Sequence, residues 1–138
     1  MMDFEYFIQK GDVKRQSKDE RLAMLLMRES FDRSKFIESL SSSKENAKYL
    51  VENIYDVLRE LIEAKLALEG FKSYSHEATI LFLRNFPKIK ESEIRYLDNL
   101  RKIRHGIKYY GRTVSLEEAE KSLEIMDVLI PKLRSLTK

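Results

Sequence analysis

The sequence predicts an all-α fold, an up-and-down bundle of four main helices with one short helix between them. Only four Gly and two Pro occur in 138 residues, and the long segments repeat apolar residues at intervals of three and four. No alternating pattern of useful length predicts a strand. This length suits a single domain over residues 1–138. We expect residues 1–16 to form an N-terminal strap and residues 17–138 to form the bundle.

The strap and the first main helix have clear boundary signals. Residues 3–10 are expected to form a short helix or strap that ends at Gly11 and docks on the bundle through its apolar side chains, which are Phe4, Phe7 and Ile8. Ser17 and Glu20 then have the spacing of a capping box, in which each side chain satisfies a free backbone N–H. The first main helix is therefore predicted from about Ser17 to about Leu40.

The second main helix is predicted from a capping box of Ser42 and Glu45 to Gly70. One apolar row marks its buried face, formed by Ala47, Leu50, Val51, Ile54, Leu58, Leu61 and Leu68. The opposite row is charged and is expected to be solvated; it contains Lys48, Glu52, Asp56, Arg59 and Glu63.

Three further helices complete the predicted bundle. A short helix containing Ala78, Ile80, Leu81 and Leu83 must stop before Pro87, because the residue that precedes proline resists helical geometry. The next helix runs from about Glu91 to Tyr110 and ends at Gly111. Ser115 and Glu118 form a third capping box for a last helix that continues towards Lys138, and Pro131 is expected to kink it or fray its end.

Composition excludes several classes of function. The chain has no Cys, which excludes disulfides and thiolate chemistry, and two His without Cys argue against a transition-metal site. The sequence contains no P-loop and no dinucleotide-binding motif, so it predicts no cofactor. The start lacks a leader pattern and no stretch reaches about 18 uncharged residues, so we expect a cytoplasmic protein without a membrane segment. With 26 basic and 23 acidic residues, net charge does not decide whether nucleic acid is a partner.

Cations and aromatics are concentrated at residues 100–111, with the sequence LRKIRHGIKYYG. On a helix, Asp98, Arg101, His105 and Tyr109 share one stripe because they are three, four and four residues apart. Arg104 and Lys108 lie beside this stripe. Here arginines could hold a phosphate while His105 exchanges a proton, Tyr109 orients the substrate and Asp98 fixes the imidazole.

An alternative interpretation assigns this cluster no ligand. Its cations would offset the negative end of the helix dipole, and its aromatics would pack at the end of the bundle. Gly106 costs about 1 kcal/mol inside a helix relative to Ala, which close approach of a ligand, another backbone or a crossing helix would explain. His76 is similarly open, since a lone histidine at a helix start is more often a surface or capping residue.

These motifs together resemble the HEPN family of helical domains. Residues 100–106 followed by Tyr109 are similar to the late-helix signature of HEPN domains. Residues 69–70 and 75–78 are similar to the exit of their second helix and the entry of their third, and the helix order agrees from about residue 17 onward. The resemblance implies a nucleotide- or RNA-binding module and a homodimer in which two late-helix motifs meet in a cleft.

Many HEPN members are metal-independent ribonucleases, in which an Arg is followed after four to six residues by His. Here Arg101 and Arg104 are too close to His105, and Tyr109 holds the position of the family's His relative to Arg104. Tyrosine is a poor general base because its pKa is near 10. Cleavage would then depend on His105 as a substitute. A third hypothesis for the function is a purely structural dimerisation bundle.

Members of the family are also often encoded with a minimal nucleotidyltransferase. The two form toxin–antitoxin pairs in which the partner modifies a tyrosine near the motif. The resemblance therefore implies Tyr109 or Tyr110 as the acceptor.

Overall fold

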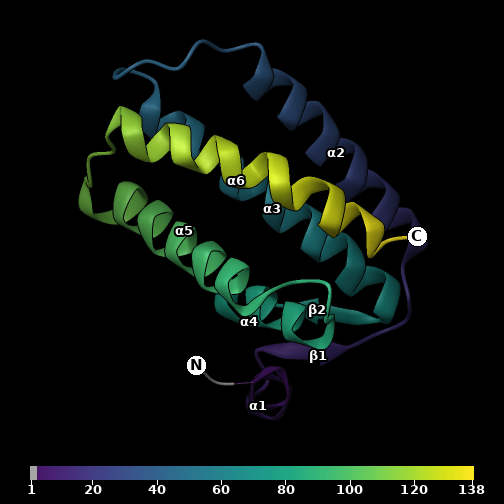
Figure 1. Ribbon diagram of the computed structural model, residues 1–138. Coiled ribbons are helices and arrows are strands. Elements are labelled where there is room, and N and C mark those ends of the chain that lie inside the picture. The colour runs from purple at the N-terminus through teal and green to yellow at the C-terminus, as the bar shows by residue number, and fades with distance from the viewer. Residues whose placement is uncertain (1–2) are drawn as a thin grey trace.

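Four long helices make up most of this chain, as the computed structural model of residues 3–138 shows (Figure 1). In chain order they are α2 (Glu20–Glu38), α3 (Ala47–Glu69), α5 (Glu91–Tyr110) and α6 (Leu116–Ser135). Two short helices, α1 (Phe4–Lys10) and α4 (His76–Leu81), complete the helical part. The prediction of an all-α helical bundle is therefore confirmed. Within residues 3–138, no helix combines the length and apolar character that crossing a membrane requires.

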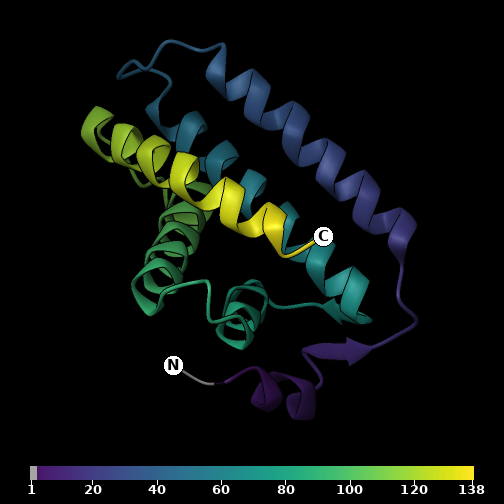
Figure 2. The same ribbon diagram turned by 45° about the vertical axis from the view of Figure 1, so that its right-hand side comes forward.

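Helix α3 is the centre of the bundle. It packs against α2, α5 and α6, and the turned view in Figure 2 shows α2 and α6 running beside it while α5 crosses at a steeper angle. Most of its apolar side chains are fully buried, among them Leu50, Ile54, Leu58 and Leu61. Because α3 touches every other long helix, most of its surface lies against another element.

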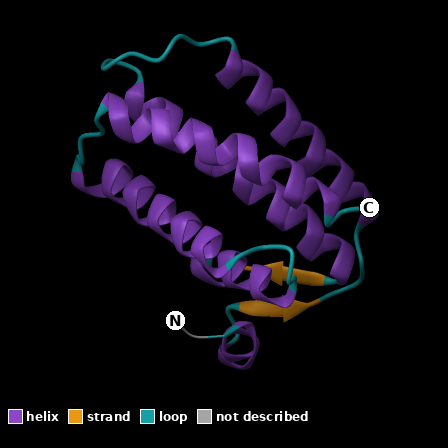
Figure 3. Cartoon of the chain, viewed as in Figure 1, coloured by secondary structure: helices purple, strands orange, loops and turns teal. Residues whose placement is uncertain are grey.

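A small two-stranded sheet closes one end of the bundle, which is the main departure from the predicted fold (Figure 3). Strand β1 (Val13–Arg15) pairs antiparallel with β2 (Phe71–Ser73), with Val13 opposite Ser73. The prediction of no strand is wrong here because three residues are too short to show an alternating pattern. The pairing ties the N-terminal strap to the end of α3, and Phe4 and Phe7 are buried in the core as expected.

Two predicted helix starts are wrong by a few residues. Helix α2 begins at Glu20, not Ser17, because the carboxylate of Asp19 accepts a hydrogen bond from the backbone N–H of Leu22 at 2.9 Å. The predicted box of Ser42 and Glu45 is likewise replaced. Here Ser43 and Asn46 exchange side-chain to backbone hydrogen bonds ahead of α3.

The remaining boundaries agree with the sequence. Gly70 ends α3 in the left-handed conformation with φ 82°, where a side chain would be strained. Helix α4 passes into a short 3₁₀ turn, η1 (Phe82–Asn85), that ends before Pro87. The capping box of Ser115 and Glu118 is present at the start of α6. That helix continues past Pro131 to Ser135, so the proline lies in its last turns without ending it.

Candidate functional site

The second half of α5 faces α3 and the start of α4 across a cavity of about 230 Å³. Six side chains line it, and none of these lining residues is a carboxylate; they are Tyr55, His76, Arg101, Arg104, His105 and Tyr109. The last four belong to the predicted stripe or lie beside it on α5. The sequence therefore predicted the lining residues on α5, and the structure adds Tyr55 from α3 and His76 from α4.

Arg104 lines the cavity and contacts residues of α3. Its guanidinium carbon is 5.5 Å from the centre of the Tyr55 ring, a cation–π arrangement. Its ion pair with Asp56 is long, at 3.5 Å, and Arg59 takes the same carboxylate oxygen at 3.2 Å. Among residues 3–138 the Nε of Arg104 is buried without a hydrogen-bond partner. Two arginines therefore share one carboxylate, which leaves donors of Arg104 uncommitted.

The charged row of α3 is exposed at Lys48, as the sequence predicted, but the rest of the row is only partly exposed. Asp56, Arg59 and Glu63 are half-buried, and Arg59 donates to Glu63 at 2.8 Å as well as to Asp56. The row continues to Arg104 through Asp56. The prediction failed because helix periodicity identifies the face opposite the apolar row but does not reveal that α5 approaches that face.

A buried tyrosine and a histidine form the far wall. The hydroxyl of Tyr55 and Nδ1 of His76 are 3.0 Å apart, and the two rings are nearly parallel at 17°. Burial raises the pKa of the Tyr55 hydroxyl far above its ordinary value, so this group stays protonated. Partial desolvation of the ring, followed by the charges of Arg59 and Arg104, lowers the pKa of His76 below its ordinary value. A neutral imidazole accepts the hydrogen bond from the hydroxyl in one tautomer and donates one to its oxygen in the other.

Arg101 is oriented by carboxylates outside the cavity. Its Nε donates to Asp98 at 2.8 Å, and its other end is 3.9 Å from Glu77 of α4. Lys102 also approaches Asp98, at 3.5 Å. Asp98 was expected to orient the imidazole of His105, but its carboxylate is taken by Arg101 and Lys102. Its observed contact therefore positions an arginine of the cavity.

His105, Tyr109 and Tyr110 gather at the end of α5. The ring of His105 is 4.8 Å from that of Tyr109 and 5.6 Å from that of Tyr110. Tyr109 is 64% exposed and Tyr110 is 78% exposed, so neither ring is packed into the bundle. Tyr110 and Lys108 are exposed and lie outside the lining of the cavity. The mouth of the cavity therefore carries an imidazole and a phenol ring that remain accessible.

Gly106 makes room for the chain that follows α5. A Cβ at this position would lie 3.0 Å from Cδ and 3.2 Å from Cβ of Arg112. The backbone N–H of Arg112 also donates to the Gly106 carbonyl at 3.1 Å. The glycine is thus explained by close approach of the side chain of Arg112, and not by a crossing helix.

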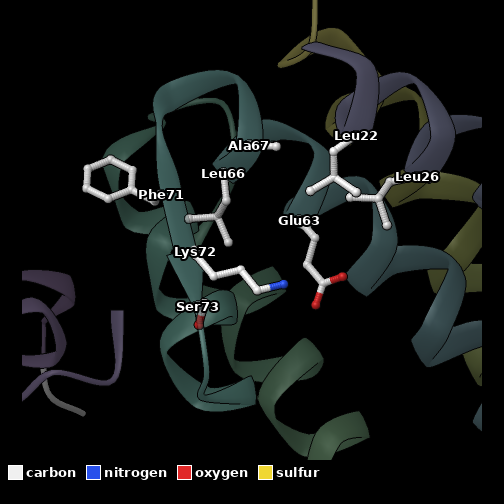
Figure 4. Close-up of a pocket in the computed structure, with 8 residues that line it drawn as sticks. All are labelled: Leu22, Leu26, Glu63, Leu66, Ala67, Phe71, Lys72 and Ser73. Atoms are coloured by element: carbon white, nitrogen blue, oxygen red, sulfur yellow. The ribbon is translucent and has the colours of Figure 1, made fainter. Parts of the chain in front are cut away.

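A second hollow, between α2, α3 and β2, has a different character (Figure 4). Its volume is about 70 Å³, and half of its lining residues are aliphatic, including Leu22, Leu26 and Leu66. Glu63 and Lys72 point toward one another across it in Figure 4. A space of this size accommodates a few waters. The cavity beside α5 is the larger of the two and presents far more hydrogen-bond donors.

Two cavity residues lacked a usable signal in the sequence. Tyr55 belongs to the buried side of α3 and is indistinguishable by spacing from the aliphatic residues around it. His76 was visible but open to a capping interpretation. The cap is Ser75, whose hydroxyl accepts from the N–H of Ala78, and this leaves the His76 ring free to meet Tyr55.

No group of three or more His, Asp or Glu side chains within residues 3–138 is arranged to hold a metal ion. The side chains that line the cavity supply guanidinium, imidazole and phenol groups. Comparison with protein-family models, with curated proteins and with solved structures finds no match for this chain.

Proposed function

We propose that this chain is an HEPN-like module that binds nucleotides or RNA in the cavity between α3, α4 and α5. The observation that carries the proposal is the lining: two arginines, two histidines and two tyrosines surround about 230 Å³ without a lining carboxylate. Such a lining offers guanidinium donors, imidazole and phenol groups, and no negative charge. A phosphate group next to an exposed aromatic base fits this chemistry.

The two arginines suit the phosphate. Arg101 is held by Asp98, so its orientation is set before a ligand arrives. Arg104 has donors that Asp56 does not occupy, since that carboxylate also serves Arg59. The base would stack on His105 or Tyr109 at the mouth, where both rings are exposed.

A metal-independent ribonuclease is the second candidate, and a specific observation favours it. His76 and His105 line the same cavity from different helices. The lowered pKa of His76 keeps its imidazole neutral at neutral pH, as a general base requires. In the tautomer whose Nδ1–H donates to the Tyr55 oxygen, the free Nε2 of His76 would accept the proton of a 2′-hydroxyl that attacks phosphorus. The 5′-oxygen would leave with a proton from His105, giving a 2′,3′-cyclic phosphate and a 5′-hydroxyl.

A partner enzyme is part of the same proposal. The resemblance to HEPN domains implies a toxin–antitoxin type of pair with a minimal nucleotidyltransferase, and a shared cleft in a homodimer. Modification requires an accessible hydroxyl. The high exposure of Tyr109 and Tyr110 supports them as acceptors.

Binding of a labelled single-stranded RNA, followed by fluorescence anisotropy over a salt series, tests the proposal. Arg104→Gln should weaken binding and reduce the slope of log affinity against log salt by about 0.7, the effect of one lost phosphate contact. Arg95→Gln is the matched control, because Arg95 is an exposed residue of α5 outside the lining. Equal loss in both variants, or no binding by the unmodified protein, would refute the proposed site.

Cleavage is tested on the same RNA in EDTA. If the second candidate holds, His76→Gln and His105→Gln each abolish formation of the cyclic phosphate while RNA remains bound. Binding without cleavage by the unmodified protein would leave the binding module as the function and eliminate the nuclease.

A further inference from the structure

The outward face of α2 carries apolar side chains that nothing in the bundle covers. Met24 is 70% exposed, and Leu25 and Phe36 are each 56% exposed. The opposite side of the helix packs on α3 through small residues, and Ser30 donates to the carbonyl of Val57 at 2.9 Å. Both ribbon views place α2 at the edge of the molecule (Figures 1 and 2).

Two charged residues lie between these apolar side chains. Arg28 and Asp32 follow Met24 at intervals of four, and Phe36 completes the row, so the four residues form one slowly winding stripe. Both charged residues are exposed, and within residues 3–138 neither forms an ion pair. Met24 and Leu25 are adjacent on this face, and Phe36 lies on the same face about three turns away. Apolar side chains grouped on one face indicate an interaction surface more strongly than scattered ones do.

We propose that this face binds a second copy of the chain, with two α2 helices packed antiparallel about a two-fold axis near residue 30. In that register Met24 lies opposite Phe36 of the second copy, and Arg28 lies opposite Asp32 of the second copy. Two-fold symmetry makes each pair occur twice. The stripe thus pairs opposite charges with each other and apolar groups with each other.

Neighbouring registers lack this complementarity. An axis near residue 28 would put Arg28 against its own copy, and an axis near residue 32 would do the same to Asp32. Like charges placed directly opposite at an interface oppose association. A parallel arrangement would likewise stack each charge on itself. Only the axis near residue 30 joins both opposite charges and both large apolar groups.

This interface leaves the cavity available. No residue of α2 lines the space between α3, α4 and α5. The inference is therefore independent of the proposed function, and it differs from the pairing of late-helix motifs that the HEPN resemblance implies. An α2 dimer would keep the mouth at Tyr109 open to a ligand or a modifying enzyme.

Cysteine cross-linking tests the register directly, because the chain has no Cys of its own. A protein with both Met24→Cys and Phe36→Cys should form a disulfide-linked dimer under mild oxidation. Either change alone should not, since equivalent positions would be 12 residues, or about 18 Å, apart along the axis, beyond the reach of a disulfide. Efficient linkage through single cysteines would overturn the antiparallel register.

Charge exchange tests the same interface without cross-links. The proteins are compared by sedimentation equilibrium, and the unmodified chain is expected to self-associate through α2 independently of a pairing of late-helix motifs. Arg28→Asp and Asp32→Arg alone should each weaken the dimer roughly tenfold, because two attractive pairs become repulsive, and the double exchange should restore it. Arg95→Asp serves as the control of equal charge change. A monomeric unmodified protein, or a dimer indifferent to all these changes, would overturn the proposal.

Discussion

Replacing Tyr55 by Phe isolates the hydrogen bond that joins α3 to α4 at the cavity. The substitution removes one oxygen and keeps the ring, so the packing and the cation–π contact with Arg104 remain. The hydroxyl is 3.0 Å from Nδ1 of His76, and the side chain is almost fully buried. We expect a loss of about 1 kcal/mol in the free energy of unfolding, the usual net value of one such bond.

That loss corresponds to a measurable change in melting temperature. The entropy of unfolding is about 2.1 cal/mol/K per residue, so 138 residues give about 0.29 kcal/mol/K. One kcal/mol then lowers the melting temperature by roughly 3 to 4 °C. Differential scanning calorimetry measures it without a ligand.

A double-mutant cycle with His76→Ala identifies the cause. Once the imidazole is absent, Tyr55→Phe should cost little or nothing, since the hydroxyl has already lost its partner. A loss of the same size in both backgrounds would show that the hydroxyl stabilises the fold by another route. No loss in the unmodified background would refute the bond itself.

Two further predictions follow from the pKa of His76 and the conformation of Gly70. Because the folded state lowers the pKa of His76, the unfolded state binds the proton more tightly, so stability is lost as pH falls through 6.5. His76→Gln should reduce this loss, as urea titrations at several pH values would measure. His105→Gln serves as the comparison. Gly70→Ala should destabilise by more than the roughly 1 kcal/mol expected of Gly111→Ala, because its Cβ would also lie 2.8 Å from a backbone carbonyl; thermal melts that rank them the other way would contradict this.

The sequence predicted the helices of the bundle because the signals that define a helix are local. Capping residues, glycine ends and apolar spacing act within one or two turns, and they placed α5 at Glu91–Tyr110 as predicted. The start of α2 was misplaced because Asp19 competes with Ser17 for the same role, and spacing does not rank two nearby caps. The sequence did not predict the two strands because each has only three residues.

The cavity was predictable only on the side that one helix carries. Helical spacing joined Arg101, His105 and Tyr109, because residues on one stripe are neighbours in any helix. The contacts with Tyr55 and His76 depend on how α5 crosses α3 and α4, over sequence separations that no periodic pattern spans. The half-burial of the charged row on α3 has the same origin.

The contacts of the cation cluster on α5 bear on the interpretation that assigns it no ligand. A helix dipole acts within the last turn, where Lys108 is the basic residue, and it does not reach Arg101 or Arg104, which lie further from Gly111. Packing of the aromatics at the end of the bundle is likewise inconsistent with rings of Tyr109 and Tyr110 that are mostly exposed. Arg104 shares its carboxylate with Arg59, so intramolecular pairing leaves it only partly neutralised. An anion in the cavity would supply the charge that Asp56 does not provide alone.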